Sequence, residues 1–342
     1  MVAVIVAVRV LALLVVEARA IATARAIAPL LERVAASIKE MPNLSVGEGH
    51  TIYYEEHGNP KGRPVVVLHG GPGGGLQRSV LNFFDLGRWH VILYDQRGCG
   101  KSTPKAPAGL RTNTTWHLVA DIERLRTHLE ISRWQLFGGS WGSTLALAYA
   151  SKYPKAISGM ILRGIFLGEP WETAWLYEEG GASRLRPAEW ARFVAGCSHN
   201  HRRRRLTACY RKRLADRRTR KTAARAWWRW EHILSSVKPT VDHTPLKTVT
   251  ALSILENHYF SHNCWLRPGE LLRAAARLRE VPTTIIQGEF DLVCPPAAAY
   301  ALHKAMPHSQ LIMVPGAGHS MSEPGIAKAL SDAAAASASV RT

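Results

Sequence analysis

The sequence predicts an α/β protein in which a doubly wound, mainly parallel sheet is interrupted by an inserted helical cap. Short apolar runs alternate with stretches of helical periodicity, as is typical of buried parallel strands joined by helices. The strand signal is lost over residues 168–280, a segment rich in Trp, Arg, Ala and Leu, and it returns toward the C-terminus. With 342 residues, of which 46% are hydrophobic, the chain can bury one large core.

The predicted elements begin shortly after residue 42. Residues 44–54 alternate in polarity around a glycine turn and predict a β-hairpin. Apolar runs predict the buried strands that follow, and apolar residues at helical spacing predict the helices between them. We expect strands at residues 64–68, 89–94, 134–137, 159–162, 283–286 and 310–314, and helices at residues 116–129, 143–153 and 324–336.

The expected domain organisation has four segments. They are an N-terminal extension (residues 1–40), a first part of the α/β core (41–167), a helical cap (168–280) and a second part of the core (281–342). Within the extension, residues 1–16 are apolar, but Arg9 interrupts them and they fall short of the roughly 20 residues of a membrane-spanning helix. An extra helix, an organelle transit peptide and a secretory signal all remain open for this extension.

The positive charge of the chain is concentrated in one stretch. The formal net charge is +18, and residues 202–229 hold 13 Lys and Arg against the single acidic Asp216. Such a balance raises nucleic acid or an anionic surface as a partner. A local charge run is more often a solvated face, so we expect no nucleic-acid partner and no stable membrane insertion.

The five cysteines predict neither a disulfide framework nor a zinc site. Their number is odd and no C-x-x-C pair occurs among them. We therefore expect a reducing compartment and a cytoplasmic location, with organelle targeting through the first 40 residues as the alternative.

A nucleophile motif follows the third buried strand. Gly138-Gly139-Ser140-Trp141-Gly142 matches G-x-S-x-G and stands between an apolar strand and a predicted helix, where a strained turn exposes the serine hydroxyl. Side chains at the flanking glycines would clash with the neighbouring strand and helix. Ser140 is the candidate nucleophile; the alternative is a glycine-rich turn that binds phosphate or nothing.

A glycine-rich run after the first buried strand predicts an oxyanion hole. The run is HGGPGGG at residues 69–75. Backbone N–H groups of Gly71 and Trp141 can stabilise the developing oxyanion without side-chain rearrangement. A flexible loop or a phosphate cradle is the alternative, although the G-x-x-x-x-G-K-[ST] pattern of a phosphate loop is absent.

The serine needs a base and an acid that follow it in the chain. Asp291 lies just beyond the strand at 283–286, and His319 lies just beyond the strand at 310–314. Both are therefore at carboxyl ends of strands, the edge where such sheets place their sites. A histidine accepts the serine proton and a carboxylate orients the imidazole. Glu289 is the second choice for the acid.

The long strings around these residues resemble one known family. They are HGGPGGG at 69–75, DQRGCGKSTP at 95–104, NTTWHLVADIERLR at 113–126, GGSWGSTLALAYA at 138–150, LRGIF at 162–166, ENHYF at 256–260 and GAGHS at 316–320. This set is similar to the proline iminopeptidases, or prolyl aminopeptidases, of the α/β-hydrolase fold. The resemblance covers residues 45–330 and implies release of N-terminal proline from peptides through an acyl-enzyme, without metal or cofactor.

The same resemblance implies a site for the substrate amine. It assigns Glu231 and Glu256 in the cap to the ammonium group, and Phe166 and Phe260 to the pyrrolidine ring. An exopeptidase has to hold this cation at a defined distance from its nucleophile, which charge-assisted hydrogen bonds achieve. Either glutamate could instead pair with a nearby arginine.

Two other functions stay open at the level of sequence. An esterase or amidase of different specificity would keep the serine, histidine and aspartate but would need no amine anchors. A basic binding protein would use residues 202–229 and retain the core as a scaffold. Leu176-Tyr177, where the family typically has two aromatics, and the arginine-rich stretch are departures that bear on substrate preference.

Overall fold

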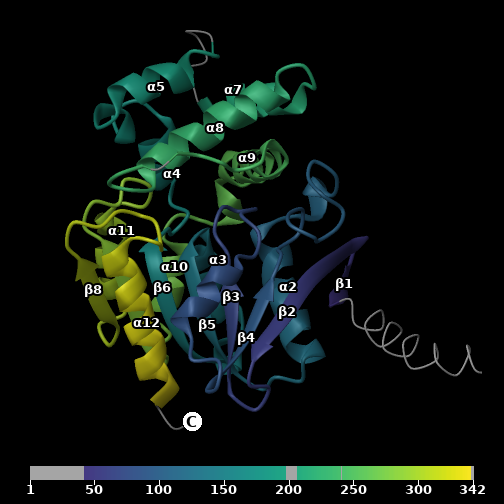
Figure 1. Ribbon diagram of the computed structural model, residues 1–342, viewed down its shortest axis with the longest axis vertical. Helices are drawn as coiled ribbons and strands as arrows, with labels where there is room; N and C mark the ends of the chain where they lie inside the picture. The colour runs from purple at the N-terminus through teal and green to yellow at the C-terminus, as the bar shows by residue number, and fades with distance from the viewer. Residues whose placement is uncertain (1–41, 198–205, 240, 340–342) are drawn as a thin grey trace, which may run out of the picture. The chain divides into compact units, whose positions relative to one another are not determined.

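The computed structural model describes residues 42–197, 206–239 and 241–339, and in this part of the chain an eight-stranded sheet carries helices on both faces (Figure 1). The predicted extension at residues 1–40 lies outside the described residues. Among the helices that the structure does describe, none has both the length and the apolar character required to span a bilayer.

The sheet is mainly parallel, as predicted. Its order is β1-β2-β4-β3-β5-β6-β7-β8, and parallel pairing runs without a break from β4 through β3 to β8. β2 pairs with β4 in the antiparallel direction. The strands are β1 (Asn43–Gly47), β2 (His50–Gly58), β3 (Arg63–Leu68), β4 (Trp89–Tyr94), β5 (Trp134–Ser140), β6 (Ile157–Ile165), β7 (Thr283–Gly288) and β8 (Gln310–Val314).

Consecutive strand residues bury their side chains on opposite faces of this sheet. Leu136 and Ile285 join the larger core, which the helices α2, α3 and α11 cover. Phe137 and Ile286, one residue later in each strand, join a smaller core under η1 and α12. The helices outside the segment between β6 and β7 are η1 (Arg78–Phe83), η2 (Leu110–Thr112), α2 (Thr115–His128), α3 (Trp141–Lys152), η3 (Pro154–Ala156), α11 (Pro296–Ala305) and α12 (Pro324–Ser339).

Only helices lie between β6 and β7 among the described residues. They are α4 (Pro170–Tyr177), η4 (Ala182–Arg184), α5 (Pro187–Val194), α7 (Leu206–Ala215), α8 (Arg220–Leu234), α9 (Leu246–Ser261), η5 (Asn263–Trp265) and α10 (Glu270–Ala275). In Figure 1, α4, α5, α7, α8 and α9 lie beyond the carboxyl ends of the parallel strands. The last helix, α10, already packs on α3 and α11. We call residues 168–280 the cap; these boundaries remain a prediction.

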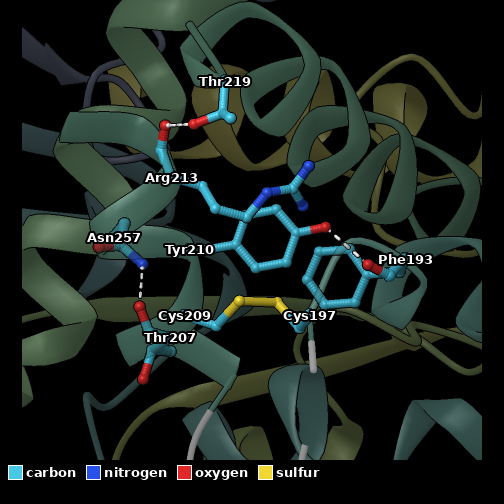
Figure 2. Close-up of a disulfide and its surroundings, with 8 residues drawn as sticks. All are labelled: Phe193, Cys197, Thr207, Cys209, Tyr210, Arg213, Thr219 and Asn257. Atoms are coloured by element: carbon cyan, nitrogen blue, oxygen red, sulfur yellow. Dashed lines mark hydrogen bonds between the residues drawn. A yellow bond between two sulfur atoms is a disulfide. The ribbon is translucent and has the colours of Figure 1, made fainter. Parts of the chain in front are cut away.

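The cap contains a disulfide, so the prediction of unpaired cysteines is wrong for Cys197 and Cys209 (Figure 2). The Cα atoms of the two residues are 6.2 Å apart. The end of α5 meets the first turns of α7 here, and Tyr210 donates its hydroxyl to the carbonyl of Phe193, whose ring stacks on it. The spacing of 12 residues matches no motif that would predict a disulfide. The two cysteines come together because the end of α5 packs near the start of α7. With this disulfide, the cysteines no longer favour a reducing compartment.

Candidate active site

Ser140 lies on a sharp turn between β5 and α3. Its backbone has φ 58° and ψ −127°, a strained conformation for a residue with a side chain, and α3 begins at the next residue. A Cβ atom at Gly138 would lie 2.3 Å from the carbonyl oxygen of Gly142, and one at Gly142 would lie 2.0 Å from the carbonyl oxygen of Leu68. Glycine at both flanking positions therefore allows the strand, the turn and the helix to pack in contact.

The structure brings His319 and Asp291 together at the carboxyl ends of β8 and β7. His319 Nδ1 and Asp291 Oδ2 are 2.7 Å apart. The other carboxylate oxygen accepts the backbone N–H groups of Val293 and Cys294 at 3.0 and 2.8 Å. These bonds orient the carboxylate, which in turn orients the imidazole of His319 through Nδ1.

The serine hydroxyl is not yet engaged by the histidine in this structure. Ser140 and His319 line one cavity, but no hydrogen bond joins them in the described part of the chain. Ser140 Oγ lies 3.9 Å from Cys294 Sγ. Burial and the neighbouring Asp291 raise the pKa of the Cys294 thiol, so this cysteine stays protonated beside the serine. Catalytic hydrogen bonds of this kind commonly tighten only when substrate is bound.

The two predicted oxyanion donors come from different segments. Gly71 lines the cavity and adopts φ 114°, a conformation that favours glycine. Trp141 is the first residue of α3, so its backbone N–H belongs to the free donors of a helix N-terminus. Its indole ring is fully buried behind the turn.

Glu231 and Glu256 lie together on the cap side of the same cavity. Tyr177 donates its hydroxyl to Glu231, and Trp227 donates its indole N–H to Glu256 Oε2 at 2.8 Å. Burial raises the pKa of Glu231 to about 7. Burial and the charge of Glu231 raise the pKa of Glu256 well above its ordinary value. Among the described residues, neither glutamate forms an ion pair with an arginine. The alternative that the glutamates pair with nearby arginines is therefore wrong for this structure.

The cavity has a volume of about 620 Å³ and joins the core to the cap. Phe166 and Phe260 meet edge to face with ring centroids 5.7 Å apart, and Tyr177 packs on Phe260. This aromatic wall is apolar, in contrast to the carboxylates beside it. The core contributes Gly71, Ser140, Arg163, Phe166, Cys294 and His319 to the lining, and the cap contributes Leu176, Tyr177, Glu231, Glu256 and Phe260.

Several functional neighbours were missed by reasoning from the sequence. Gln287 on β7 contacts Asp291 Oδ2 at 3.2 Å and accepts the N–H of Ile165. Arg163 on β6 lines the cavity and donates to the backbone carbonyl of His319 at 2.6 Å. Arg163 stands in the LRGIF string, three residues before Phe166, but no motif rule gives a role to this arginine. Only the fold shows that its guanidinium lies against Gly139.

Glu289 and a buried cluster of His69, Asp95 and Cys99 form hydrogen bonds that hold loops in place. Glu289, the second choice for the acid, is exposed and accepts the N–H of Gly316. His69, Asp95 and Cys99 lie close enough to share a metal ion. Asp95, however, already accepts the backbone N–H groups of Leu76 and Lys101, and His69 Nε2 accepts that of Gln96. Cys99 donates its thiol to the carbonyl oxygen of Gln96. Asp95 and His69 therefore hold the loop after β3 and the loop after β4 together by hydrogen bonds.

Comparison with known proteins gives the family. The α/β hydrolase fold family matches residues 63–325. A probable proline iminopeptidase from Leptolyngbya boryana is 48% identical over 296 residues, which cover 85% of this chain and 91% of that protein. A proline iminopeptidase from Arabidopsis thaliana is 45% identical over 295 residues, or 84% of this chain and 77% of that protein. The chain belongs to the proline iminopeptidase family.

Solved structures agree with this family at the level of fold. A crystal structure of proline iminopeptidase from Mycobacterium smegmatis matches 86% of this chain and 98% of that chain, with a TM-score of 0.58 and 20% identity. At this identity the likeness supports the fold alone. Together with the family match, it makes the chain a hydrolase with the predicted α/β-hydrolase architecture.

Proposed function

We propose that the protein is a serine exopeptidase that releases N-terminal proline from peptides. The observation that carries this proposal is the pair of carboxylates, Glu231 and Glu256, in the cavity that also holds Ser140. Two buried carboxylates without a cationic partner are costly, and a substrate ammonium group would provide that partner. The names of the relatives point to the same substrate class.

The core residues have roles that follow from their geometry. Ser140 Oγ attacks the carbonyl carbon of the terminal proline while His319 takes the hydroxyl proton. The tetrahedral oxyanion binds the N–H groups of Gly71 and Trp141. As the intermediate collapses, the peptide C–N bond breaks and His319 returns the proton to the leaving amine. Water then attacks the prolyl ester by the same route and releases proline.

The cap glutamates and the aromatic wall formed by Phe166 and Phe260 select the substrate. The secondary ammonium of proline carries one positive charge and two N–H donors, which suit the two carboxylates. Phe166 and Phe260 offer the pyrrolidine ring an apolar wall. Because the amine anchors and the nucleophile have fixed positions, only the first peptide bond reaches Ser140.

An esterase of the same fold is the alternative, since it would use the same serine, histidine and aspartate. It would leave the glutamate pair without a purpose. A short panel of substrates separates the two functions: prolyl and alanyl arylamides beside a short-chain ester, each with and without a serine-directed organophosphorus inactivator. We expect inactivator-sensitive hydrolysis that is fastest on the prolyl arylamide. Hydrolysis of the ester without any arylamidase activity would contradict the proposal.

A further inference from the structure

Gln96 is buried between the two segments that carry the proposed oxyanion donors. It lies in the loop that follows β4, is 1% exposed, and is not among the residues that line the cavity. Its backbone N–H donates to His69 Nε2 at 3.0 Å, and its side-chain Nε2 donates to the carbonyl oxygen of His69 at 2.9 Å. Its Oε1 accepts the indole N–H of Trp141 at 3.0 Å. One side chain therefore joins the 69–75 loop to the start of α3.

The orientation of this amide follows from its partners. A carbonyl oxygen on one side can only accept, and an indole N–H on the other side can only donate. Exchanging the oxygen and nitrogen of Gln96 would place two donors against each other at Trp141 and two acceptors against each other at His69. Only a side chain that both donates and accepts satisfies both neighbours.

The segments that Gln96 joins are already in contact near the cavity. Leu68 lies so close to α3 that a Cβ atom at Gly142 would collide with its carbonyl oxygen. Beyond it, His69 Nδ1 contacts the carbonyl oxygen of Gly70 at 3.0 Å, and the same oxygen accepts the N–H of Gly74. The bond from Gln96 to His69 thus holds the peptide unit that immediately precedes Gly70 and Gly71.

We propose that Gln96 is a positioning residue that keeps the N–H groups of Gly71 and Trp141 aimed at a single oxyanion. The inference rests on the proposed function, because it takes these two groups as the oxyanion donors. Such donors accelerate the reaction because they are preorganised, and a small displacement removes much of their effect. A variant at this position should therefore lose transition-state binding and keep ground-state binding.

The first test replaces the hydrogen-bonding side chain by an apolar one of similar length, Gln96→Met. Loss of a whole oxyanion donor typically costs about 10²–10³ in kcat. For displaced donors we expect a loss of about tenfold to hundredfold in kcat on a prolyl arylamide, with KM within about twofold of wild type. The affinity for a prolyl boronic acid, whose tetrahedral adduct places a hydroxyl in the oxyanion hole, should fall by the same factor as kcat. The affinity for free proline should stay within about twofold.

A matched control is available in Gln135→Met. Gln135 is also buried, on β5, and pairs with Val65 and Gly159 away from the carboxyl end of the sheet. Its replacement should leave kcat and boronate affinity within about twofold of wild type. If both variants lose kcat equally, or if proline and boronate affinities fall together in Gln96→Met, Gln96 has only a general structural role and the proposal is overturned.

A second variant, Gln96→Glu, keeps the shape and tests the hydrogen bonds themselves. A protonated carboxylic acid can donate to the carbonyl of His69 and accept from Trp141, as the amide does, whereas a carboxylate would oppose that carbonyl. The ratio of kcat in this variant to kcat in wild type should approach one at low pH and fall as the pH rises. A ratio that stays well below one even at low pH would overturn the proposal.

The result can be separated from a failure of the proposed function. The same kcat comparison is made with an acetate ester, and the same affinity comparison with a simple alkyl boronic acid, because neither probe depends on the amine anchors. If wild type cleaves the ester but not prolyl arylamides, the exopeptidase function is wrong. The ester and alkyl boronate measurements then still support or overturn the role of Gln96.

Discussion

The core and the cap place their functional groups in the cavity by different means. In the core, backbone groups position the proposed acid and nucleophile: Asp291 accepts two N–H groups, and Ser140 is held by the turn between β5 and α3. In the cap, side chains position side chains, as Trp227 does for Glu256 through its indole N–H. Backbone geometry changes little when the sequence changes, whereas the packing of aromatic side chains changes much more. Under the proposed function, the core supplies the reaction, and the cap glutamates with Phe166 and Phe260 select the substrate.

Removing the proposed nucleophile should cause the largest loss of kcat, and this loss should be equal for every substrate. Ser140→Ala takes away the attacking oxygen, and we expect a loss of at least about 10⁴-fold in kcat on a prolyl arylamide and on a short ester alike. The alanine fits the turn, so the midpoint of thermal unfolding should stay near that of wild type. A variant that keeps even a tenth of wild-type activity would show that another residue is the nucleophile.

The cap carboxylates should give a pH dependence that the core reaction alone does not have. Burial raises the pKa of Glu231 to about 7, and burial and the charge of Glu231 raise the pKa of Glu256 well above its ordinary value. Protonation below these values removes the charge that binds the ammonium group. The ratio of kcat/KM for a prolyl arylamide to kcat/KM for a neutral ester should therefore fall as the pH is lowered through 7, by up to about tenfold per unit for each proton taken up.

The ester in this ratio cancels any titration of the catalytic groups that both substrates share. Glu231→Gln should shift the lower limb of the profile, while Glu178→Gln, on an exposed cap residue, should leave it in place. A ratio that is constant between pH 5 and 9 would mean that the glutamates do not bind the amine.

Cys294 should make the site sensitive to thiol reagents although it has no chemical role. Its sulfur is 3.9 Å from Ser140 Oγ and lines the cavity, so a bulky organomercurial on it would block the substrate. Burial raises the pKa of this thiol, so reagents that require the thiolate should react slowly. We expect Cys294→Ala to retain activity within about threefold and to resist the mercurial. Loss of activity in this variant would give the cysteine a role in catalysis.

The basic surface of the cap should have the smallest effect of all. Arg211, Lys212, Arg217 and Arg218 are exposed on α7 and the turn after it. Replacing all four by Gln should change kcat/KM for a prolyl arylamide by less than about twofold. Submicromolar, salt-dependent binding of duplex DNA that disappears in this variant would instead show a nucleic-acid partner.

The same contrast explains what the sequence could predict. The six strands and three helices were expected from periodicity, but the strand expected to be buried at residues 310–314 is the edge strand β8, in which only Val314 is buried. The motifs around Ser140, Asp291 and His319 fall at strand ends, where short-range patterns are informative. Helix α11 was not predicted. Seven of the nine predicted site residues line one cavity, while Asp291 contacts His319 and Trp141 directly follows Ser140. Their catalytic roles remain proposals.

Contacts between distant elements could not be predicted in this way. The pairing of Cys197 with Cys209 depends on how α5 meets α7. The bond from Tyr177 to Glu231 joins α4 to α8, and the bonds of Gln96 join three segments of the core. In each case the residue type is ordinary, and its contact depends on how separate elements pack against one another.

The most direct test of the account is a double comparison at the amine site. It measures kcat/KM for free and N-acetylated prolyl arylamide on wild type and on Glu256→Gln, with Glu178→Gln as the control. Acetylation removes the positive charge that the two carboxylates would bind, and losing one partner of such a pair costs about 2–5 kcal/mol, or roughly 30-fold to several-thousand-fold. The account predicts that wild type strongly prefers the free amine and that Glu256→Gln loses most of this preference. Equal rates on both substrates with wild type would contradict it, because the amine would then not be bound.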